Sequence, residues 1–185
     1  MRRQELERFR GQPVDDLIGP GLKLLLVGIN PGLWTAAVNA HFARPGNRFW
    51  PALHRSGIVD RVIDASRGCT PEDRNHLIER GVGITNIVPI ATARADELSA
   101  ADMRVGGARL RALVDELQPP VVAVLGLTAY RQAFKQPKAA LGRQSANWGA
   151  SQLWLAPNPS GLNAHETVDS LAAKYREIAQ AAGIV

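Results

Sequence analysis

Short apolar runs alternate with longer stretches of mixed polarity along this chain. Four runs have the length and aliphatic content of buried strands, at residues 23–29, 82–88, 121–125 and 152–156. Between and after them, residues 47–56, 70–80, 99–117, 128–134 and 165–182 are predicted to be helical. Strands that alternate with helices are typical of a parallel sheet covered on both faces. We therefore predict an α/β fold, a three-layer α/β/α sandwich with a short, mostly parallel central sheet.

Two of the predicted helices begin at residues that suit a helix N-terminus. Thr70 can cap the first turn and Pro71 fits the first helical position, with two acidic residues directly behind them. Ser99 and Asp102 have the spacing of a capping box. These signals place helix starts close to residues 70 and 99.

The composition is that of one globular domain. The chain has 185 residues, of which 45% are hydrophobic and 21% charged. We expect a single domain over residues 1–185, with an N-terminal helical extension over 1–22 and the core over 23–185. The first residues include basic side chains but no apolar segment behind them, and no apolar run approaches the ~20 residues of a membrane span. We expect a cytoplasmic protein without membrane contact, and a monomer as the default state.

The net charge of the chain indicates what kind of molecule it binds. The net charge is +5, and only four of the 22 basic residues are lysine. Arginine is well suited to binding phosphate groups, so the excess favours a polyanionic partner. A compositional bias toward arginine explains the same excess without any partner. Four arginines near the expected site are candidate phosphate contacts: Arg44, Arg48, Arg94 and Arg143.

Several common kinds of site are missing from the sequence. A single cysteine, Cys69, excludes an internal disulfide and an all-cysteine cluster within one chain. The four histidines lack the spacing of a zinc-binding helix, and no dinucleotide, phosphate-loop or nucleophile-elbow motif is present. We therefore predict no metal and no cofactor.

Three polar segments follow predicted strands, at residues 30–45, 89–98 and 157–164. The carboxyl ends of parallel strands meet at one edge of a sheet, where ligands bind in folds of this class. Two of these segments contain Asn-Pro turns, at Asn30 and at Asn158. Either asparagine can be a simple turn former, but together they can direct two carboxamides into one crevice.

The motifs at these places resemble a known enzyme family. In order along the chain, they are GINPGL, Phe42, PGNRFW, GITNIV and NPSGL. This set resembles the mismatch-specific uracil/thymine DNA glycosylases, the branch of the uracil-DNA glycosylase superfamily that acts on G·U and G·T pairs. The likeness runs from about residue 23 to the last helix. It implies a nucleoid-associated enzyme that needs no metal or cofactor and acts on double-stranded DNA containing mismatched uracil.

The resemblance also implies roles for individual residues. Asn30 matches the asparagine that positions the attacking water, and Phe42 matches the aromatic that stacks on the flipped base. Backbone amides near Ile29 and Phe42 are expected to contact the pyrimidine edge. Thr35 falls beside the pyrimidine 5-position, where its bulk bears on whether a thymine methyl fits. The resemblance also places Asn158 near the flipped nucleotide.

The segment after Asn158 matches the part of the family that contacts the duplex. Ser160 and Gly161 are expected at the sugar-phosphate, and Gly161 with Leu162 begins a small wedge that enters the base stack. The sequence then departs from the family, because Asn163, Ala164 and His165 stand where a serine and a nearby arginine are common. His165 either replaces that arginine in contacting the opposing guanine or only begins the last helix.

One acidic residue lies outside the matched set. Hydrolysis of an N-glycosidic bond builds positive charge on the sugar while the base leaves as an anion. A carboxamide at position 30 can orient water but cannot deprotonate it, which implies slow turnover. Asp96, on the middle polar segment, is therefore a candidate general base or stabiliser of the sugar cation. The alternative is a solvated acid just before a helix.

Three functions remain open on the sequence alone. The first is a monofunctional DNA glycosylase, since no lysine falls in the expected crevice to form a Schiff base. The second is a hydrolase that cleaves the same bond in a free nucleoside or nucleotide, against which the wedge segment and the arginine excess argue. The third is a non-catalytic nucleic-acid binding module, against which the polar turns and the aromatic at the strand ends argue.

Overall fold

A five-stranded sheet forms the centre of the molecule in the computed structural model, which describes residues 1–185. Its strands are β1 (Leu24–Gly28), β2 (Val82–Asn86), β3 (Val121–Leu125), β4 (Gly142–Arg143) and β5 (Gln152–Ala156). They lie in the order β2-β1-β3-β5-β4, and all pairs are parallel except β4 with β5. This arrangement confirms the predicted mostly parallel sheet.

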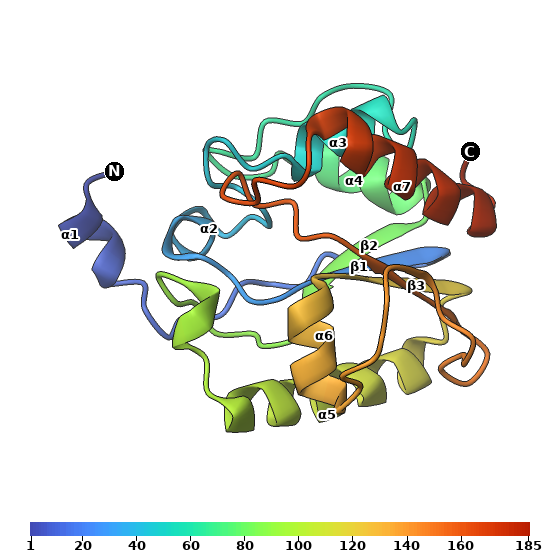
Figure 1. Cartoon of the computed structure of the whole chain (residues 1–185). Helices are drawn as coiled ribbons and strands as arrows, with labels where there is room; N and C mark the ends of the chain where they lie inside the picture. The colour runs from blue at the N-terminus through green and yellow to red at the C-terminus, as the bar shows by residue number, and fades with distance from the viewer.

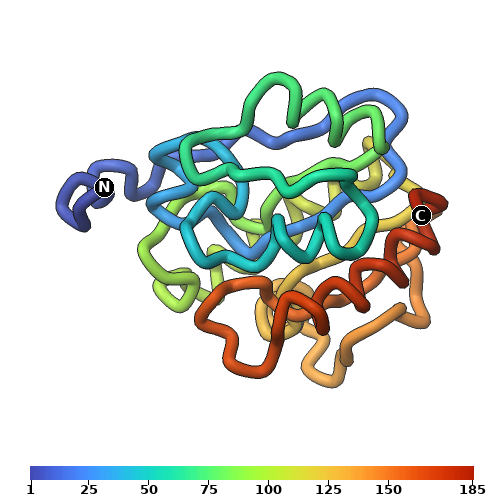
Figure 2. Tube along the Cα trace, turned by 90° about the horizontal axis from the view of Figure 1, so that it is seen from above, coloured from blue at the N-terminus to red at the C-terminus, as the bar shows by residue number.

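Helices cover both faces of the sheet (Figure 1). On one face lie α3 (Phe49–Arg55), α4 (Pro71–Glu79) and α7 (Val168–Ala181), and on the other lie α5 (Ala100–Leu117) and α6 (Leu127–Phe134). The predicted three-layer sandwich is therefore correct. None of these helices is both long and apolar enough to cross a membrane. Figure 2 shows the two chain termini at opposite ends of the molecule.

Side chains alternate between the two layers along each buried strand. In β1, Leu24 and Leu26 pack with the α3, α4 and α7 layer, whereas Leu25 and Val27 pack with α5 and α6. All five residues of β1 are buried, as are those of β2 and β3. Burial on both faces is the physical reason that these strands show continuous apolar runs rather than alternation.

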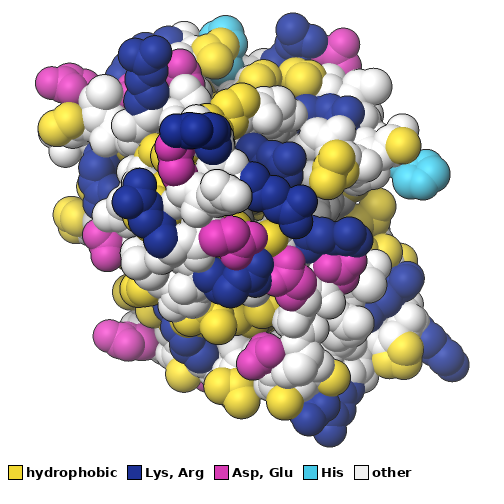
Figure 3. Space-filling view, turned by 90° about the vertical axis from the view of Figure 1, so that its left-hand side faces the viewer, with side chains coloured by type: hydrophobic (Ala, Val, Ile, Leu, Met, Phe, Trp, Pro, Cys, Tyr) yellow, Lys and Arg dark blue, Asp and Glu magenta, His cyan; other side chains and the backbone are white.

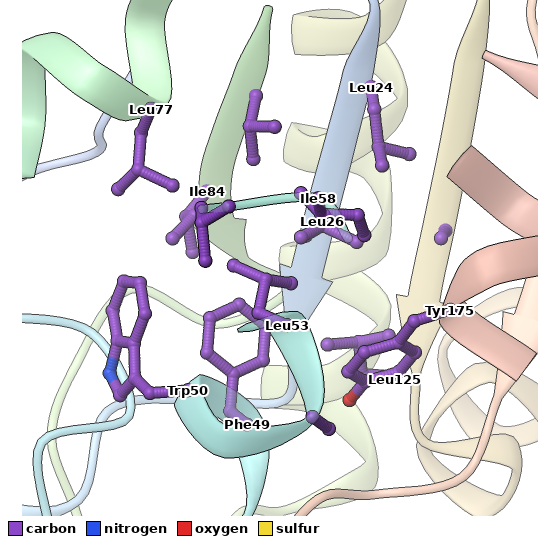
Figure 4. Packing of buried hydrophobic residues seen from close by; sticks show 14 of the residues in the cluster. Leu24, Leu26, Phe49, Trp50, Leu53, Ile58, Leu77, Ile84, Leu125 and Tyr175 are labelled. Carbon is purple, nitrogen blue, oxygen red and sulfur yellow. The ribbon is translucent and has the colours of Figure 1, made fainter. Parts of the chain in front are cut away.

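The largest of the three hydrophobic clusters contains aromatic side chains near the carboxyl edge of the sheet. Figure 4 shows Phe49 and Leu53 of α3 directed toward the strands, and Tyr175 of α7 beside Leu125 at the end of β3. Phe49 and Tyr175 are fully buried, with ring centroids 6.2 Å apart. The core therefore extends to the strand ends, where it supports the loops above them.

The predicted helix starts agree with the observed caps. The Thr70 hydroxyl accepts a hydrogen bond from the backbone N–H of Asp73 at 3.1 Å. The Ser99 hydroxyl accepts one from the N–H of Asp102 at 3.0 Å, and the Asp102 carboxylate accepts one from the N–H of Ser99 at 2.8 Å. Both helices therefore begin where the capping residues predict.

The N-terminal segment differs from the expected helical extension. Helix α1 (Arg3–Glu7) covers only five residues, and the rest of segment 1–22 is irregular. Leu17 pairs its backbone with Ile84 on β2 and packs in the largest hydrophobic cluster. The segment is therefore joined to the sheet rather than separate from it.

Candidate active site

A pocket opens at the carboxyl ends of β1, β2, β3 and β5, with a cavity volume of about 150 Å³. Most of its lining residues come from the three polar segments that the sequence singles out. Backbone hydrogen bonds hold two of these segments side by side: the N–H of Val88 donates to the Ile29 carbonyl at 3.0 Å, and that of Thr92 donates to the Pro31 carbonyl at 3.1 Å. Figure 3 shows this face of the molecule, with Lys and Arg side chains spread across it and acidic side chains between several of them.

Asn30 lies in the pocket wall with its carboxamide held in one orientation. Its Nδ2 lies 3.2 Å from the Pro31 carbonyl oxygen, 3.0 Å from that of Ile90 and 2.8 Å from the Thr92 hydroxyl. Carbonyl oxygens only accept hydrogen bonds, so the amide nitrogen must face them. The Thr92 hydroxyl donates its own proton to the Arg94 carbonyl at 2.7 Å and can only accept from Asn30. Oδ1 is thus the free hydrogen-bonding atom of Asn30.

Phe42 forms an aromatic wall of the same pocket. Its ring stacks on Phe49, with centroids 4.0 Å apart and planes 19° apart. Its backbone has φ of 52°, an uncommon conformation for a residue with a side chain, and its N–H donates no hydrogen bond within the chain. Strained residues of this kind cluster at binding sites. The buried Phe49 therefore supports one face of the Phe42 ring. The backbone N–H of Phe42, a residue that lines the pocket, has no partner within the chain.

Thr35 and Ile29 complete the wall on the β1 side. Thr35 is 5% exposed, and its hydroxyl accepts a hydrogen bond from the Ala43 N–H at 3.3 Å. Thr35 belongs to a short helix, α2 (Leu33–Val38), which the sequence pattern did not predict because the whole of 30–45 was expected to be irregular. The helix directs Thr35 inward, toward the pocket that it lines.

Asn158 and Ser160 line the pocket from the segment after β5. The Asn158 Oδ1 accepts a hydrogen bond from the Ser160 N–H at 3.0 Å, so the side chain does shape the turn. Its Nδ2 remains free, because no hydrogen bond within the chain uses it. The structure therefore brings Asn30, Phe42 and Asn158 together around one cavity.

Comparison with known proteins identifies the family. Residues 16–181 match the family model described as the uracil DNA glycosylase superfamily. The chain belongs to that superfamily. Its fold is similar to the solution NMR structure of a protein from Methanosarcina acetivorans that is proposed to be a uracil DNA glycosylase. The two share 14% identity with a TM-score of 0.57, over 92% of this chain and 98% of that one.

A loop beside the pocket holds the other predicted DNA contacts of this superfamily member. Gly161, Leu162 and His165 are exposed and Asn163 is half-buried, with the Leu162 side chain projecting into solvent at 80% exposure. Helix α7 begins only at Val168, so His165 lies before the last helix and not in it.

Arg48 holds that loop in place. Its guanidinium donates to the carbonyls of Asn163 at 2.7 Å and of Ser160 and Gly161 at 3.4 Å each. Its backbone N–H donates to the Pro159 carbonyl at 3.0 Å. The sequence suggested Arg48 as a phosphate contact, but the structure gives its guanidinium these loop carbonyls as partners.

Asp96 is the predicted catalytic residue that the structure does not bring to the pocket. It lies in the short helix η1 (Ala95–Glu97), its side chain is 63% exposed, and it forms an ion pair with Arg94 at 2.5 Å. Its neighbours Arg94 and Ala95 line the cavity, whereas Asp96 does not. This placement fits the alternative interpretation of a solvated acid before a helix.

Two buried polar residues in the pocket were missed by the sequence reasoning. His41 and Asn86 are 5% and 6% exposed, and both line the cavity. Asn86 lies within the GITNIV motif and ends β2, and His41 directly precedes Phe42. Asn86 could have been found from the sequence, because a polar residue at the last position of a buried parallel strand lies next to the ligand crevice.

Of the other two candidate phosphate contacts not yet placed, one lies at the pocket and one does not. Arg44 lines the pocket, and Arg143 lies on β4, away from it. None of the four lysines lines the pocket, and Lys174 pairs with Glu166 at 3.1 Å. No group of three or more His, Cys, Asp or Glu side chains lies together in a way that could hold a metal ion.

Proposed function

We propose that this protein is a monofunctional DNA glycosylase that flips uracil out of mismatched duplex DNA and hydrolyses its N-glycosidic bond. The observation that carries the proposal is the fixed carboxamide of Asn30, whose free Oδ1 shares one cavity with the supported ring of Phe42. An acceptor that cannot rotate is suited to holding a water molecule at a defined place.

The reaction needs little chemistry from the protein beyond positioning. Water held by Asn30 Oδ1 attacks the sugar C1′, and the C1′–N1 bond breaks with its electron pair leaving on the base. The proton that the water loses passes to solvent or to the departing base. Donors at the base edge stabilise the developing anion, and the free Phe42 N–H and Asn158 Nδ2 are available for this. The base must first leave the duplex to enter the pocket.

Preference for a mismatch belongs to the exposed loop. Leu162 is suited to fill the space that a flipped nucleotide leaves, at a cost in stacking that mispaired bases reduce. Asn163 and His165 lie beside it and are the candidate contacts to the opposing guanine. A mismatched uracil opposite guanine is therefore the proposed substrate, with thymine and other damaged pyrimidines admitted to the extent that Thr35 leaves room.

A single assay tests the proposal. Labelled duplexes with G·U, A·U or G·T pairs, single-stranded uracil and free deoxyuridine are incubated without metal, and abasic sites are then cleaved by alkali. We expect cleavage of the G·U duplex by the wild-type protein and a rate lower by about 10²-fold or more in Asn30→Ala. Asn147→Ala, an exposed asparagine outside the pocket, is the matched control.

The same assay distinguishes the other candidates. Hydrolysis of free deoxyuridine alone would assign a small-molecule hydrolase, and duplex binding without any excision would assign a binding module. An equal rate for Asn30→Ala and Asn147→Ala would remove the proposed role of Asn30.

A further inference from the structure

The tautomer of His41 is determined by its surroundings. Its Nε2 lies 2.9 Å from the backbone carbonyl oxygen of Asp15. A carbonyl oxygen can only accept, so Nε2 must carry the proton. The Trp50 indole donates to the His41 carbonyl at 3.1 Å and fixes the backbone at the same point. In the neutral ring, Nδ1 is then left as a hydrogen-bond acceptor.

That acceptor faces the carboxamide of Asn86. The Asn86 Nδ2 lies 3.3 Å from His41 Nδ1, and an acceptor there requires the amide nitrogen rather than the oxygen. The oxygen consequently lies on the other side of the amide. A Cβ added to Gly28 would lie 2.5 Å from Asn86 Oδ1 and 3.1 Å from the edge of the Phe42 ring. The oxygen therefore lies close to the aromatic wall of the pocket.

We propose that His41 is a positioning residue that sets the polarity of the Asn86 amide, so that the pocket presents a fixed acceptor to the edge of the base. The inference rests on the proposed function, because it assigns the base edge that the site accepts. Uracil and thymine carry an N3–H donor, whereas cytosine carries an acceptor at N3. A fixed Asn86 Oδ1 accepts a hydrogen bond from the N3–H of uracil or thymine. It repels the N3 of cytosine, because both atoms are acceptors. His41 thereby makes the pocket select uracil over cytosine.

Three charged residues act on His41, but burial decides its charge state. Asp15 and Asp16 lie on the N-terminal segment, with the Asp16 carboxylate bound by Thr85 at 2.6 Å and by Arg109 of α5 at 3.2 Å. Arg74 of α4 also acts on the ring. Burial is the largest influence and lowers the pKa of His41 below its ordinary value, with the carboxylates opposing that effect. The ring is therefore neutral at physiological pH.

Protonation reverses the arrangement. A proton on Nδ1 turns the acceptor into a donor, and the Asn86 amide must then present Oδ1 to His41 and its nitrogen to the base. Because the pKa of His41 is lowered from 6.5, this change occurs only in more acidic solution. The preference for uracil should consequently fall as the pH is lowered through the pKa of His41.

The first test measures the tautomer in the wild-type protein. Long-range ¹H–¹⁵N NMR spectra separate protonated from unprotonated ring nitrogens of histidine. We expect His41 to show protonated Nε2 and unprotonated Nδ1 at pH 7.5. The opposite tautomer, or a doubly protonated ring, overturns the proposal whether or not any variant folds.

The second test measures selectivity without catalysis. Duplexes carry 2′-fluoro-deoxyuridine or 2′-fluoro-deoxycytidine opposite the same abasic analogue, so that neither base is paired and neither is excised. We expect His41→Leu to reduce the uracil-to-cytosine affinity ratio about tenfold, through loss of the hydrogen bond that orients Asn86. His41→Asn, which carries an acceptor oxygen at the Nδ1 position, should retain the ratio and make it independent of pH between 5 and 8.

The outcomes separate the two proposals. An unchanged ratio in His41→Leu overturns the role of His41 and leaves the glycosylase function standing. Failure of the wild-type protein to excise uracil from any duplex rejects the glycosylase function, while the tautomer and the binding ratio still report on His41.

Discussion

At the scale of single residues, the two asparagines of the pocket have opposite free ends. The Asn30 nitrogen is held by carbonyl oxygens, which leaves its oxygen free. The Asn158 oxygen is held by a backbone N–H, which leaves its nitrogen free. One side chain therefore offers an acceptor, suited to water, and the other a donor, suited to an anionic leaving base. Residue type alone does not distinguish these roles, since the partners decide which end is free.

The surroundings of Asn30 predict the effect of a carboxylate at this position. In Asn30→Asp, an oxygen would replace the nitrogen that lies 3.0 Å from the Ile90 carbonyl and 3.2 Å from the Pro31 carbonyl. Loss of both hydrogen bonds should lower the free energy of unfolding by about 1–3 kcal/mol at pH 8. Protonation supplies a new donor, so this loss should shrink as the pH is lowered toward 5. Urea unfolding at both pH values, with Asn147→Asp as control, measures the difference; equal losses for the two variants would contradict it.

The exposed Leu162 predicts a defect that is confined to double-stranded DNA. Leu162→Ala should lower excision from a G·U duplex by about tenfold, because the wedge loses its apolar contact with the base stack. Excision from single-stranded uracil should change much less. Val105 is an exposed aliphatic of α5 outside the pocket, so Val105→Ala is the matched control. Parallel losses on single and double strands would argue against a wedge.

At the scale of elements, the loop after β5 depends on the segment before α3. Arg48 binds three of the loop carbonyls, and a Cβ added to Gly161 would lie 2.6 Å from the Gly46 carbonyl oxygen. The two segments therefore pack backbone against backbone, a contact that only glycine permits at position 161. The loop with Leu162 is therefore attached directly to the segment before α3.

The hydrogen bonds of the Arg48 guanidinium to the loop predict the effect of replacing Arg48. Arg48→Lys keeps the charge, but one ammonium cannot reach the carbonyls that the guanidinium spans. Duplex affinity should fall by about tenfold while the salt dependence of binding stays the same, because a guanidinium bound to carbonyls contributes no phosphate contact. Arg143→Lys on the distant β4 is the control. A reduced salt slope would instead identify Arg48 as a phosphate contact.

Helices and strands that are marked by a pattern within their own residues were predictable from the sequence. The strands β3 and β5 were predicted with their observed bounds, and β1 and β2 within two residues at each end, because continuous aliphatic runs are typical of doubly covered strands. The six-residue α2 and the two-residue β4 were missed, since each is shorter than the stretch of residues over which its periodicity can be recognised. Asp96 lies on the predicted segment, but its side chain is exposed and pairs with Arg94 instead of lining the pocket, which no sequence pattern encodes.

At the scale of the whole molecule, the pocket floor is tied to distant parts of the fold. The Asn86 backbone carbonyl accepts a hydrogen bond from Arg109 of α5 at 3.1 Å, and Arg109 also binds Asp16 of the N-terminal segment. The Asp15 carbonyl holds His41. Helix α5, the sheet and the N-terminal segment therefore meet beside the pocket, which explains why residues before β1 belong to the core of the protein.

The burial of His41 predicts how global stability depends on pH. The unfolded chain takes up a proton on His41 near pH 6.5, whereas burial lowers the pKa of His41 in the folded state. Between these values the unfolded state binds more protons, so the free energy of unfolding falls as the pH is lowered below 6.5, by at most about 1.4 kcal/mol per pH unit. Urea unfolding between pH 7.5 and 5 measures this slope. His41→Asn removes the titrating group and should flatten it, whereas replacement of the exposed His54 by asparagine should leave it in place. A slope in His41→Asn equal to that of the wild-type protein would mean that folding does not lower the pKa of His41.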